Sequence, residues 1–557
     1  MPETIALMLE NNTLPEEYLI NSPYIKAHKN LLGGYVIVYV DEDDLIKIEN
    51  DVEGYAPDAF LPVMGLLGQS DLSAAGITQV HRQPFLNLGG QGVLVGLIDT
   101  GIDYTLDAFR YEDGSSRIAY LWDQSIEGTP PSGFNFGTEY EQSAINDALT
   151  LPDPRQAVPH VDTVGHGTFL ASVAASRERG EYIGAAPDCE LVVVKMRKAS
   201  NYDLHRFVIP PTQENAFSGT DFVLGVQYVV EKAQALGRPA AICISVGSNK
   251  GSHNGLSRFE SYLGRVSGTI GTCVCAAAGN EAQAGHHTRE RVSATGQTKD
   301  VELRVSGPNE DIYMNMWNSA ADRLSVSLKS PTGELIVRMP ARVGVSYTQR
   351  LILERSTVVV DYLFPVQRTG EQLTRIKLFS ATPGIWTITV HGDSVLDGSF
   401  HIWLPLTGFV DPGTVFLTPT PYYTIVNPAT STGVITCGAF DGALGSLAPT
   451  SSWGPTRMPA LKPDLCAPGV NVGGIFPGGG RGAMSGTSAS AAITTGAAAL
   501  MLQWAIVEGN DSSMDSYRIR SNFIAGCDRD PDISFPNNQW GYGKLDLYST
   551  FRSLRPY

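Results

Sequence analysis

Residues 93–101 read VLVGLIDTG, an apolar run that ends abruptly at an aspartate, a threonine and a glycine. A short, continuously apolar run bounded by a turn is typical of a strand covered on both faces in a parallel sheet. Further runs of this kind, AAICISVG at 240–247 and TCVCAAAGN at 272–280, alternate with helical stretches along the chain. This alternation predicts an α/β domain built on a parallel sheet.

The apolar period changes to two between residues 294 and 410. The segments 301–305, 324–328 and 385–390 alternate apolar and polar side chains, with turn sequences between them. Such alternation predicts strands with one buried face, so we expect an all-β sandwich or jelly roll inserted into the α/β domain. The predicted domains are an N-terminal unit at 1–69, an α/β domain in two parts at 70–293 and 411–557, and the β insert at 294–410.

The N-terminal unit is predicted to be small and of α+β type. We expect a short helix at Ile5–Leu9, a strand at Tyr35–Val40, and a helix at Asp43–Asp51 that opens with acidic residues. The stretch 62–76 follows and contains several glycines and serines. It suits an exposed joint between this unit and the α/β domain.

Composition excludes several classes of protein. The chain has 557 residues, of which 43% are hydrophobic and 17% charged, so it is neither disordered nor fibrous. The 57 acidic residues outnumber the 40 basic ones, and the net charge of −17 argues against a nucleic-acid partner. The seven cysteines are odd in number and form no C-x-x-C pair. They are predicted to be core residues of a protein in a reducing compartment.

Targeting and membrane signals are also absent from the sequence pattern. Met1–Thr13 carries acidic residues where a secretory signal has a basic start and a long apolar run. The apolar stretch Ala489–Val507 contains several polar residues, so it predicts a buried helix and not a membrane span. We therefore expect cytoplasmic synthesis.

Three side chains of complementary chemistry lie at the ends of predicted elements. Asp99 ends a strand, His166 lies between two glycines at the start of a helix, and Ser488 begins an alanine-rich helix. A hydroxyl at a helix N-terminus is close to free backbone N–H groups, which can hold a developing oxyanion. Loop or helix capping is the plain alternative for each residue taken singly. Asp99-Thr-Gly is also the aspartic-protease tripeptide, but no second D-[TS]-G is present.

A fourth residue, Asn280, follows another predicted strand and offers an amide for an oxyanion hole. Together the four residues supply a nucleophile, a base, an orienting carboxylate and an oxyanion donor. The run VLVGLIDTGID, VGHGTFLASVAAS, ISVGS, AAAGNEA, SSWGPT, LKPDLCAPGV and SGTSASAAITTGAAAL resembles the subtilisin-like serine proteases, whose motif order is Asp, His, Asn, Ser.

This resemblance implies the α/β subtilisin-like parallel-sheet fold and assigns roles to named residues. Asp99, His166 and Ser488 take the catalytic triad positions, Asn280 takes the oxyanion hole, and Ser245-Val246-Gly247 matches the substrate-binding segment. A glycine that ends a core strand is an equally good explanation of Gly247 from the residues alone. The sequence departs from the family after the nucleophile, where Ala489-Ser-Ala-Ala492 replaces the usual Met-Ala-x-Pro.

Within the family the chain is most similar to the clostridial spore-germination (Csp) subtilases. The similarity lies in the N-terminal unit, DYTLDAF followed by RIAYLWDQS, the β insert, and the ending QWGYGKLDLYSTFRSL. It implies a prodomain that the enzyme cuts off and keeps bound, a jelly-roll insert, a cortex-lytic prohydrolase as protein substrate, and a spore-associated location. We expect the cut near Gln69-Ser70, where the flanking residues are small. A catalytically silent subtilase that acts as a scaffold or germination receptor is the alternative function.

Metal and nucleotide sites are not predicted. His286-His287 has no partners at metal-ligand spacing, and the chain has no HExxH motif. The glycines of Gly90-Gln-Gly92 precede a strand instead of following one, which argues against a dinucleotide site. No cofactor is therefore predicted.

Overall fold

The computed structural model describes residues 4–10, 21–31, 35–41, 44, 69–177, 182–366, 369–458 and 460–554 of the chain. The chain divides into two compact units, residues 1–66 and 67–557.

The first unit contains a three-stranded antiparallel sheet in the order β1-β3-β2. Its strands are β1 (Thr4–Glu10), β2 (Ile25–Leu31) and β3 (Tyr35–Asp41). The prediction of β3 is confirmed, whereas the helix expected at Ile5–Leu9 is wrong, because this segment pairs residue by residue with β3. A short apolar run carries no decisive period, so its pairing partner determines its conformation. The helix expected at Asp43–Asp51 lies outside the described residues apart from Asp44.

An eight-stranded sheet forms the centre of the second unit, in the order β22-β21-β9-β8-β4-β7-β5-β6. Its strands are β4 (Leu94–Asp99), β5 (Ile118–Asp123), β6 (Thr138–Glu141), β7 (Glu190–Lys195), β8 (Ala240–Ile244), β9 (Thr272–Ala277), β21 (Ile435–Phe440) and β22 (Leu465–Pro468). Neighbouring strands run parallel except β5 and β6. The predicted α/β class with a parallel sheet is confirmed.

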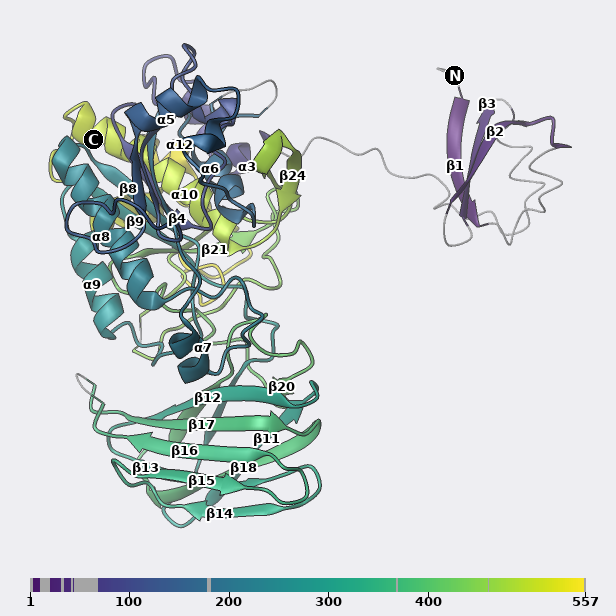
Figure 1. The fold of residues 1–557 in the computed structure, drawn as a ribbon, viewed down its shortest axis with the longest axis vertical. Coiled ribbons are helices and arrows are strands. Elements are labelled where there is room, and N and C mark those ends of the chain that lie inside the picture. Colours follow the sequence, from purple (N-terminus) through teal and green to yellow (C-terminus); the bar gives the residue numbers. More distant parts are fainter. Residues whose placement is uncertain are drawn as a thin grey trace. The chain divides into compact units, whose positions relative to one another are not determined.

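Helices cover both faces of this sheet (Figure 1). α6 (His166–Ala175) and α10 (Thr487–Leu502) pack on one face, and α8 (Gly219–Leu236) and α9 (Arg258–Ser267) on the other. Alternate residues of each strand face opposite layers, so every residue of β4, β8 and β9 is buried. This double burial explains why the strands read as unbroken apolar runs.

Shorter elements complete the α/β region. They are α3 (Gln69–Ala74), α4 (Ile77–His81), η3 (Asp107–Phe109), α5 (Gln142–Leu149), η4 (Pro154–Gln156), α7 (Asn201–Phe207), β23 (Val472–Ile475), η5 (Pro477–Gly479), β24 (Arg481–Met484), the π-helical turn η6 (Gln503–Val507), α11 (Ser516–Gly526) and α12 (Leu547–Ser553). The expected exposed joint extended to residue 76, but α3 is helical and its Leu72 is buried. The joint therefore ends before α3.

The apolar helix near the C-terminus is buried, as predicted. Among the described residues, Thr487–Val507 is the one helix long and apolar enough to cross a membrane, and most of it lies inside the protein. All seven cysteines are free and buried, which agrees with their predicted role as core residues.

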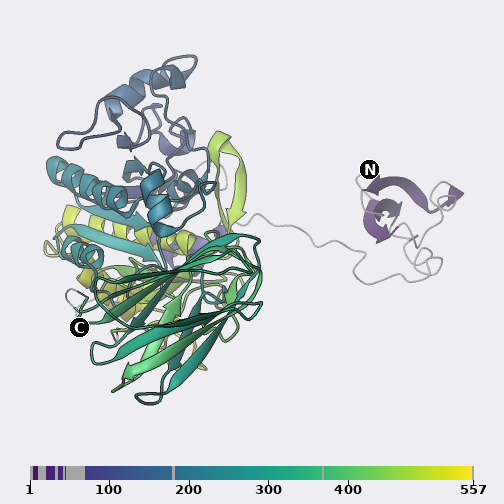
Figure 2. The same cartoon turned by 60° about the horizontal axis from the view of Figure 1, so that its bottom comes forward.

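The inserted region consists of two antiparallel sheets around one core (Figure 2). One sheet has the order β10-β19-β12-β17-β16-β15 and the other β14-β13-β18-β11-β20. The strands are β10 (His287–Arg291), β11 (Thr298–Val305), β12 (Glu310–Asn318), β13 (Arg323–Lys329), β14 (Leu335–Met339), β15 (Ser346–Arg350), β16 (Thr357–Leu363), β17 (Gln372–Ala381), β18 (Gly384–Ser394), β19 (Ser399–Trp403) and β20 (Val415–Phe416). The inserted all-β domain is confirmed; the jelly-roll connections stay a prediction.

Candidate active site

The predicted site residues follow strands or begin helices along one edge of the parallel sheet. Asp99 is the last residue of β4, Ser245 follows β8, and Asn280 comes three residues after β9. The carboxyl ends of parallel strands meet at the same edge, which is where α/β proteins bind ligands. The sheet topology therefore brings together residues that lie far apart in the sequence.

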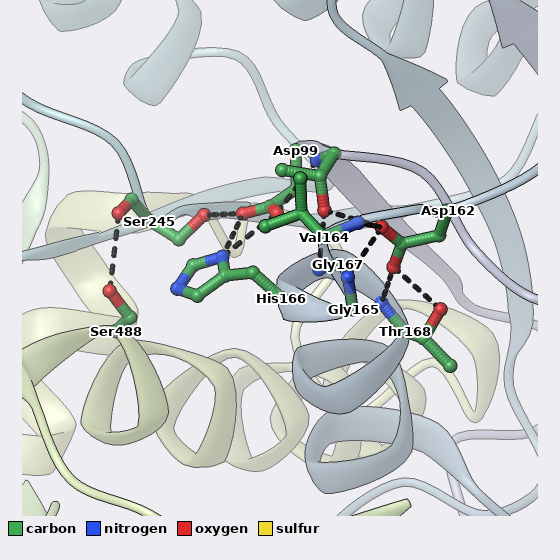
Figure 3. A network of polar contacts seen from close by, with 10 residues as sticks. Asp99, Asp162, Val164, Gly165, His166, Gly167, Thr168, Ser245 and Ser488 are labelled. Atoms are coloured by element: carbon green, nitrogen blue, oxygen red, sulfur yellow. Dashed lines mark hydrogen bonds and ion pairs between the residues drawn. The ribbon is translucent and has the colours of Figure 1, made fainter. Parts of the chain in front are cut away.

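Asp99 and His166 form an ion-pair contact in which the carboxylate is buried and the imidazole is partly exposed (Figure 3). Nδ1 of His166 lies 2.8 and 2.9 Å from the two carboxylate oxygens of Asp99. The carboxylate also accepts hydrogen bonds from the Ser245 hydroxyl and, at 2.7 Å, from the backbone N–H of Thr100. A Cβ at Gly167 would lie 2.2 Å from the carbonyl oxygen of Gly101, so only glycine lets helix α6 approach β4 this closely.

The electrostatics of this pair suit a general base. Burial by itself lowers the pKa of His166, but the charge and hydrogen bond of Asp99, together with the charge of Asp162, raise it above the ordinary value. Burial by itself raises the pKa of Asp99, but His166, Ser245 and Thr100 lower it overall. The carboxylate therefore stays ionised and favours the imidazolium that forms when His166 takes a proton.

Ser488 lies in the first turn of α10 and belongs to the same network. Its hydroxyl donates to the carbonyl oxygen of Ser245 at 3.2 Å, while the Ser245 side chain donates to Asp99. Figure 3 shows the second ring nitrogen of His166 on the side of the imidazole that faces Ser488. Hydrogen bonds of catalytic residues often tighten only when substrate is bound. The structure thus gathers the three residues, with Ser245 as the link to the nucleophile.

Asn280 is oriented by its oxygen, which leaves its amide N–H₂ for another partner. Its Oδ1 accepts from the backbone N–H of Thr487 at 3.0 Å and from the Thr487 hydroxyl at 3.3 Å. Because a backbone N–H can only donate, the atom facing it must be the amide oxygen. The Thr487 hydroxyl in turn accepts from the N–H of Gly279 at 3.1 Å. The Asn280 amide nitrogen and the backbone N–H of Ser488, in the first turn of α10, can both donate to an oxyanion.

Comparisons with known proteins agree with this geometry. The sequence profile of the Subtilase family matches residues 90–333 and 418–543. The chain belongs to the subtilase family. Its structure is similar to that of the Clostridium perfringens CspB protease, with a TM-score of 0.77 and 29% identity, over 87% of this chain and 99% of that one.

A curated relative gives a shorter match. The chain is 30% identical to the subtilisin-like protease SBT2.2 of Arabidopsis thaliana over 154 residues, which are 24% of this chain and 18% of the relative. The chain thus spans about a fifth of the length of that protein.

Sequence reasoning missed Asp162, which organises the loop before His166 in this subtilase. Its side chain is buried, and one carboxylate oxygen accepts from the N–H of Gly165 at 2.8 Å and from the Thr100 hydroxyl at 2.9 Å. The other accepts from the N–H and hydroxyl of Thr168 at 2.9 and 2.7 Å. The N-cap position of α6 is Gly165, three residues after Asp162, so the usual capping signal does not identify this aspartate.

The residues of the expected substrate-binding segment, Ser245-Val246-Gly247, have different surroundings. Ser245 contacts Asp99 and Ser488, whereas a Cβ at Gly247 would lie 2.5 Å from Val426. Glycine at position 247 is therefore required by packing inside the protein. Val246 is half-buried at the same edge.

The expected autoprocessing residues Gln69 and Ser70 form the first turn of α3. The residues before them, from 45 to 68, lie outside the described part of the chain.

The glycine-rich loop before β4 and the His286-His287 pair have structural roles. The N–H groups of Gly89, Gly90 and Gln91 all donate to Oε1 of Gln503, at 3.1, 2.7 and 3.2 Å, so this glycine-rich loop is filled by a side chain. His286 pairs with Glu281 at 2.7 Å, and His287 with His401 at 3.0 Å. Across the described residues, no three His, Cys, Asp or Glu side chains gather as a metal site.

Proposed function

We propose that this chain is a serine endopeptidase that hydrolyses peptide bonds through Asp99, His166 and Ser488. The observation that carries the proposal is the continuous polar network from Ser488 through Ser245 and Asp99 to His166 at one edge of the sheet. If His166 served only to cap a helix, a buried carboxylate whose two oxygens both contact its Nδ1 would not be needed.

The chemistry follows from the positions of these groups. Ser488 Oγ attacks the peptide carbonyl carbon while Nε2 of His166 takes the hydroxyl proton, and Asp99 holds the imidazolium through Nδ1. The carbonyl oxygen becomes an oxyanion that accepts from the Asn280 amide and the Ser488 N–H; one such donor contributes about 3–4 kcal/mol. His166 then protonates the leaving amine. Water, activated by His166, hydrolyses the acyl-enzyme and restores Ser488.

Substitution of the nucleophile tests this function. Ser488→Ala should lower kcat on a peptide substrate by roughly 10⁶-fold, because the acyl-enzyme cannot form. Ser485→Ala is the matched control: this serine is exposed, lies three residues earlier, and contacts Asn471. It should retain the wild-type rate. Near-full peptidase activity in Ser488→Ala would end the assignment.

The alternative function, a silent subtilase that serves as scaffold or receptor, is separated by active-site labelling. A fluorophosphonate reacts quickly only with a serine that an assembled triad activates. Wild type and Ser485→Ala should be labelled and Ser488→Ala should not. An unlabelled wild type would favour the scaffold.

We further infer that the enzyme cuts off its own N-terminal unit. The division of the chain between residues 66 and 67 supports a cut near this point, close to the expected Gln69-Ser70. A protease needs an extended chain in its cleft, and Gln69 and Ser70 are helical, so the bond itself should precede α3. Intact-mass analysis should show a fragment of about the size of the N-terminal unit for wild type and a full-length chain for Ser488→Ala. A wild-type chain that stays full-length contradicts this step.

The substrate is proposed to be a cortex-lytic prohydrolase of the spore. The resemblance to the Csp subtilases and the structural similarity to the CspB protease support this choice. Incubation of a candidate prohydrolase with wild type should release a shortened hydrolase, and Ser488→Ala should release none. An intact prohydrolase in the presence of an enzyme that cleaves peptides would exclude this substrate.

A further inference from the structure

A cleft of about 880 Å³ separates the α/β region from the inserted sandwich. One wall comes from residues 201–213, which include α7, and the other from residues 307–311 and 408–411 of the insert. Figure 1 shows α7 between the two regions. Gln213 Nε2 of the first wall donates to the Gly408 carbonyl of the second at 2.8 Å, and beside the cleft Lys377 Nζ donates to the Arg206 carbonyl at 3.1 Å. These hydrogen bonds join the two regions next to the cleft.

The floor of the cleft is apolar. Leu204 and Val208 are buried in the first wall, and Ile209 packs with Phe409 from the second wall against one small cluster. Phe379 of β17 adds an aromatic face. A cavity of this size with apolar side chains from two regions is typical of a ligand site.

The insert wall of the cleft is acidic. The lining residues include the carboxylates of Glu310, Asp311 and Asp411 and neither lysine nor arginine. Asp311 accepts from the N–H of Ser380 at 2.7 Å and is exposed. A hydrogen bond from the Ser306 hydroxyl, together with one from the backbone N–H of Gly413, lowers the pKa of Asp411. A positive charge on the ligand should therefore strengthen its binding to this cleft.

A chain of contacts connects the cleft with the candidate active site. Ser488 contacts Ser245, and the chain continues from there to Lys250, whose Nζ lies 3.1 Å from the centre of the Phe207 ring. Phe207 directly precedes Val208 in the cleft wall. The cleft is therefore on the Gly247 side of Ser488.

We propose that the cleft is a second substrate-binding site, which takes an extended segment of the protein substrate that is apolar and carries a basic side chain. The inference rests on the proposed endopeptidase function and adds a specificity-determining site to it. It would also explain why the insert is placed beside α7: the second wall of the cleft belongs to the insert.

Extended peptides test the second site. A short peptide that the enzyme cleaves is lengthened, at one end or the other, by an apolar segment that carries one lysine, in a series of increasing lengths. One of the two extensions should raise kcat/KM by about tenfold in wild type, and glutamate in place of the lysine should remove most of the gain. The double variant Asp311→Asn, Asp411→Asn should show no rise in kcat/KM from the extension, while it hydrolyses the short peptide at the wild-type rate. Phe409→Ala should do the same through the apolar floor. Glu302→Gln, an exposed carboxylate of the insert outside the cleft, should keep the gain.

The short-peptide rate shows whether each variant is folded. A gain that persists in both cleft variants, or no gain from either extension, overturns the second site while leaving the proposed function intact. Calorimetric titration of Ser488→Ala with the extended peptide gives a readout without catalysis. If wild type cleaves no peptide but Ser488→Ala binds the lysine peptide more tightly than the glutamate peptide, the site stands and the endopeptidase function fails. Equal affinity for the two peptides contradicts the site.

Discussion

Two histidine–aspartate pairs lie near the same edge of the sheet, and they differ in what faces the second ring nitrogen. His166 and Asp99 are joined at 2.8 Å, and His160 and Asp123 at 2.6 Å. The His166 side chain is 28% exposed, whereas that of His160 is fully buried. Nε2 of His160 accepts from the backbone N–H of Ile102 at 3.1 Å, so its ring has no nitrogen left for a substrate. Nε2 of His166 faces the side of Ser488.

The comparison teaches that the pair itself does not make a catalytic site. His160 fixes the loop that follows Asp99, because Ile102 is three residues after Asp99 and is held by the imidazole. A Cβ at Gly101 would lie 2.9 Å from Cε1 of His160, which shows how closely this loop is packed. His160 is a positioning residue, and His166 is the residue proposed as the base.

Matched substitutions of Asp99 and Asp123 should distinguish the two histidine–aspartate pairs most clearly. Asp99→Asn should lower kcat/KM on a peptide by ~10⁴-fold, because the amide no longer stabilises the imidazolium and favours the wrong tautomer. Steady-state kinetics with active-site titration checks this, and a loss below tenfold would contradict the role of Asp99.

Asn280 shows the same division between a fixed side and a free side. Its oxygen is held by Thr487 and its nitrogen is left for an oxyanion. Asn280→Ala should lower kcat by about 10²–10³-fold with a smaller change in KM, because the donor acts in the transition state. If KM instead rose about 10²–10³-fold while kcat stayed unchanged, Asn280 would act in ground-state binding of the substrate.

The pH dependence of kcat/KM should report His166. Its pKa is raised above the ordinary value of 6.5, mainly by Asp99 acting against burial. Because the base must be unprotonated, activity should fall about tenfold per pH unit on the acid side, with the midpoint above 6.5. In the residual activity of Asp99→Asn this midpoint should move to lower pH. A midpoint that does not move would show that Asp99 is not the group that raises the pKa.

Asp123→Asn should give the smallest effect on activity and a larger one on stability. The carboxylate accepts from His160 and, at 2.9 Å, from the N–H of Ser125, so its loss should lower the free energy of unfolding by about 1–3 kcal/mol. Peptide hydrolysis at a temperature where the variant is folded should fall less than tenfold. Thermal melts and kinetics measure the two effects. A loss of activity as large as that of Asp99→Asn would refute the distinction between the pairs.

Much of the site was predictable because its signals are local. Asp99, Asn280 and Ser488 stand at junctions between apolar runs and turns or helix starts, and the order of these motifs indicated the family. Asp162 was missed because it lies three residues before the N-cap Gly165 of α6, outside the usual capping position. Thr487 was missed because its partner, Asn280, is 207 residues away.

The sequence by itself determined which segments are doubly buried strands, where the helices that carry His166 and Ser488 begin, and which side chains have protease chemistry. These properties depend on neighbouring residues, whose periodicity and capping act over a few positions. Only the tertiary structure decided that Ile5–Leu9 is a strand, that His160 is closed off while His166 is open, and that α7 and the insert enclose a cleft. Each of these depends on contacts between distant segments, and no local pattern specifies which distant partner a segment will meet.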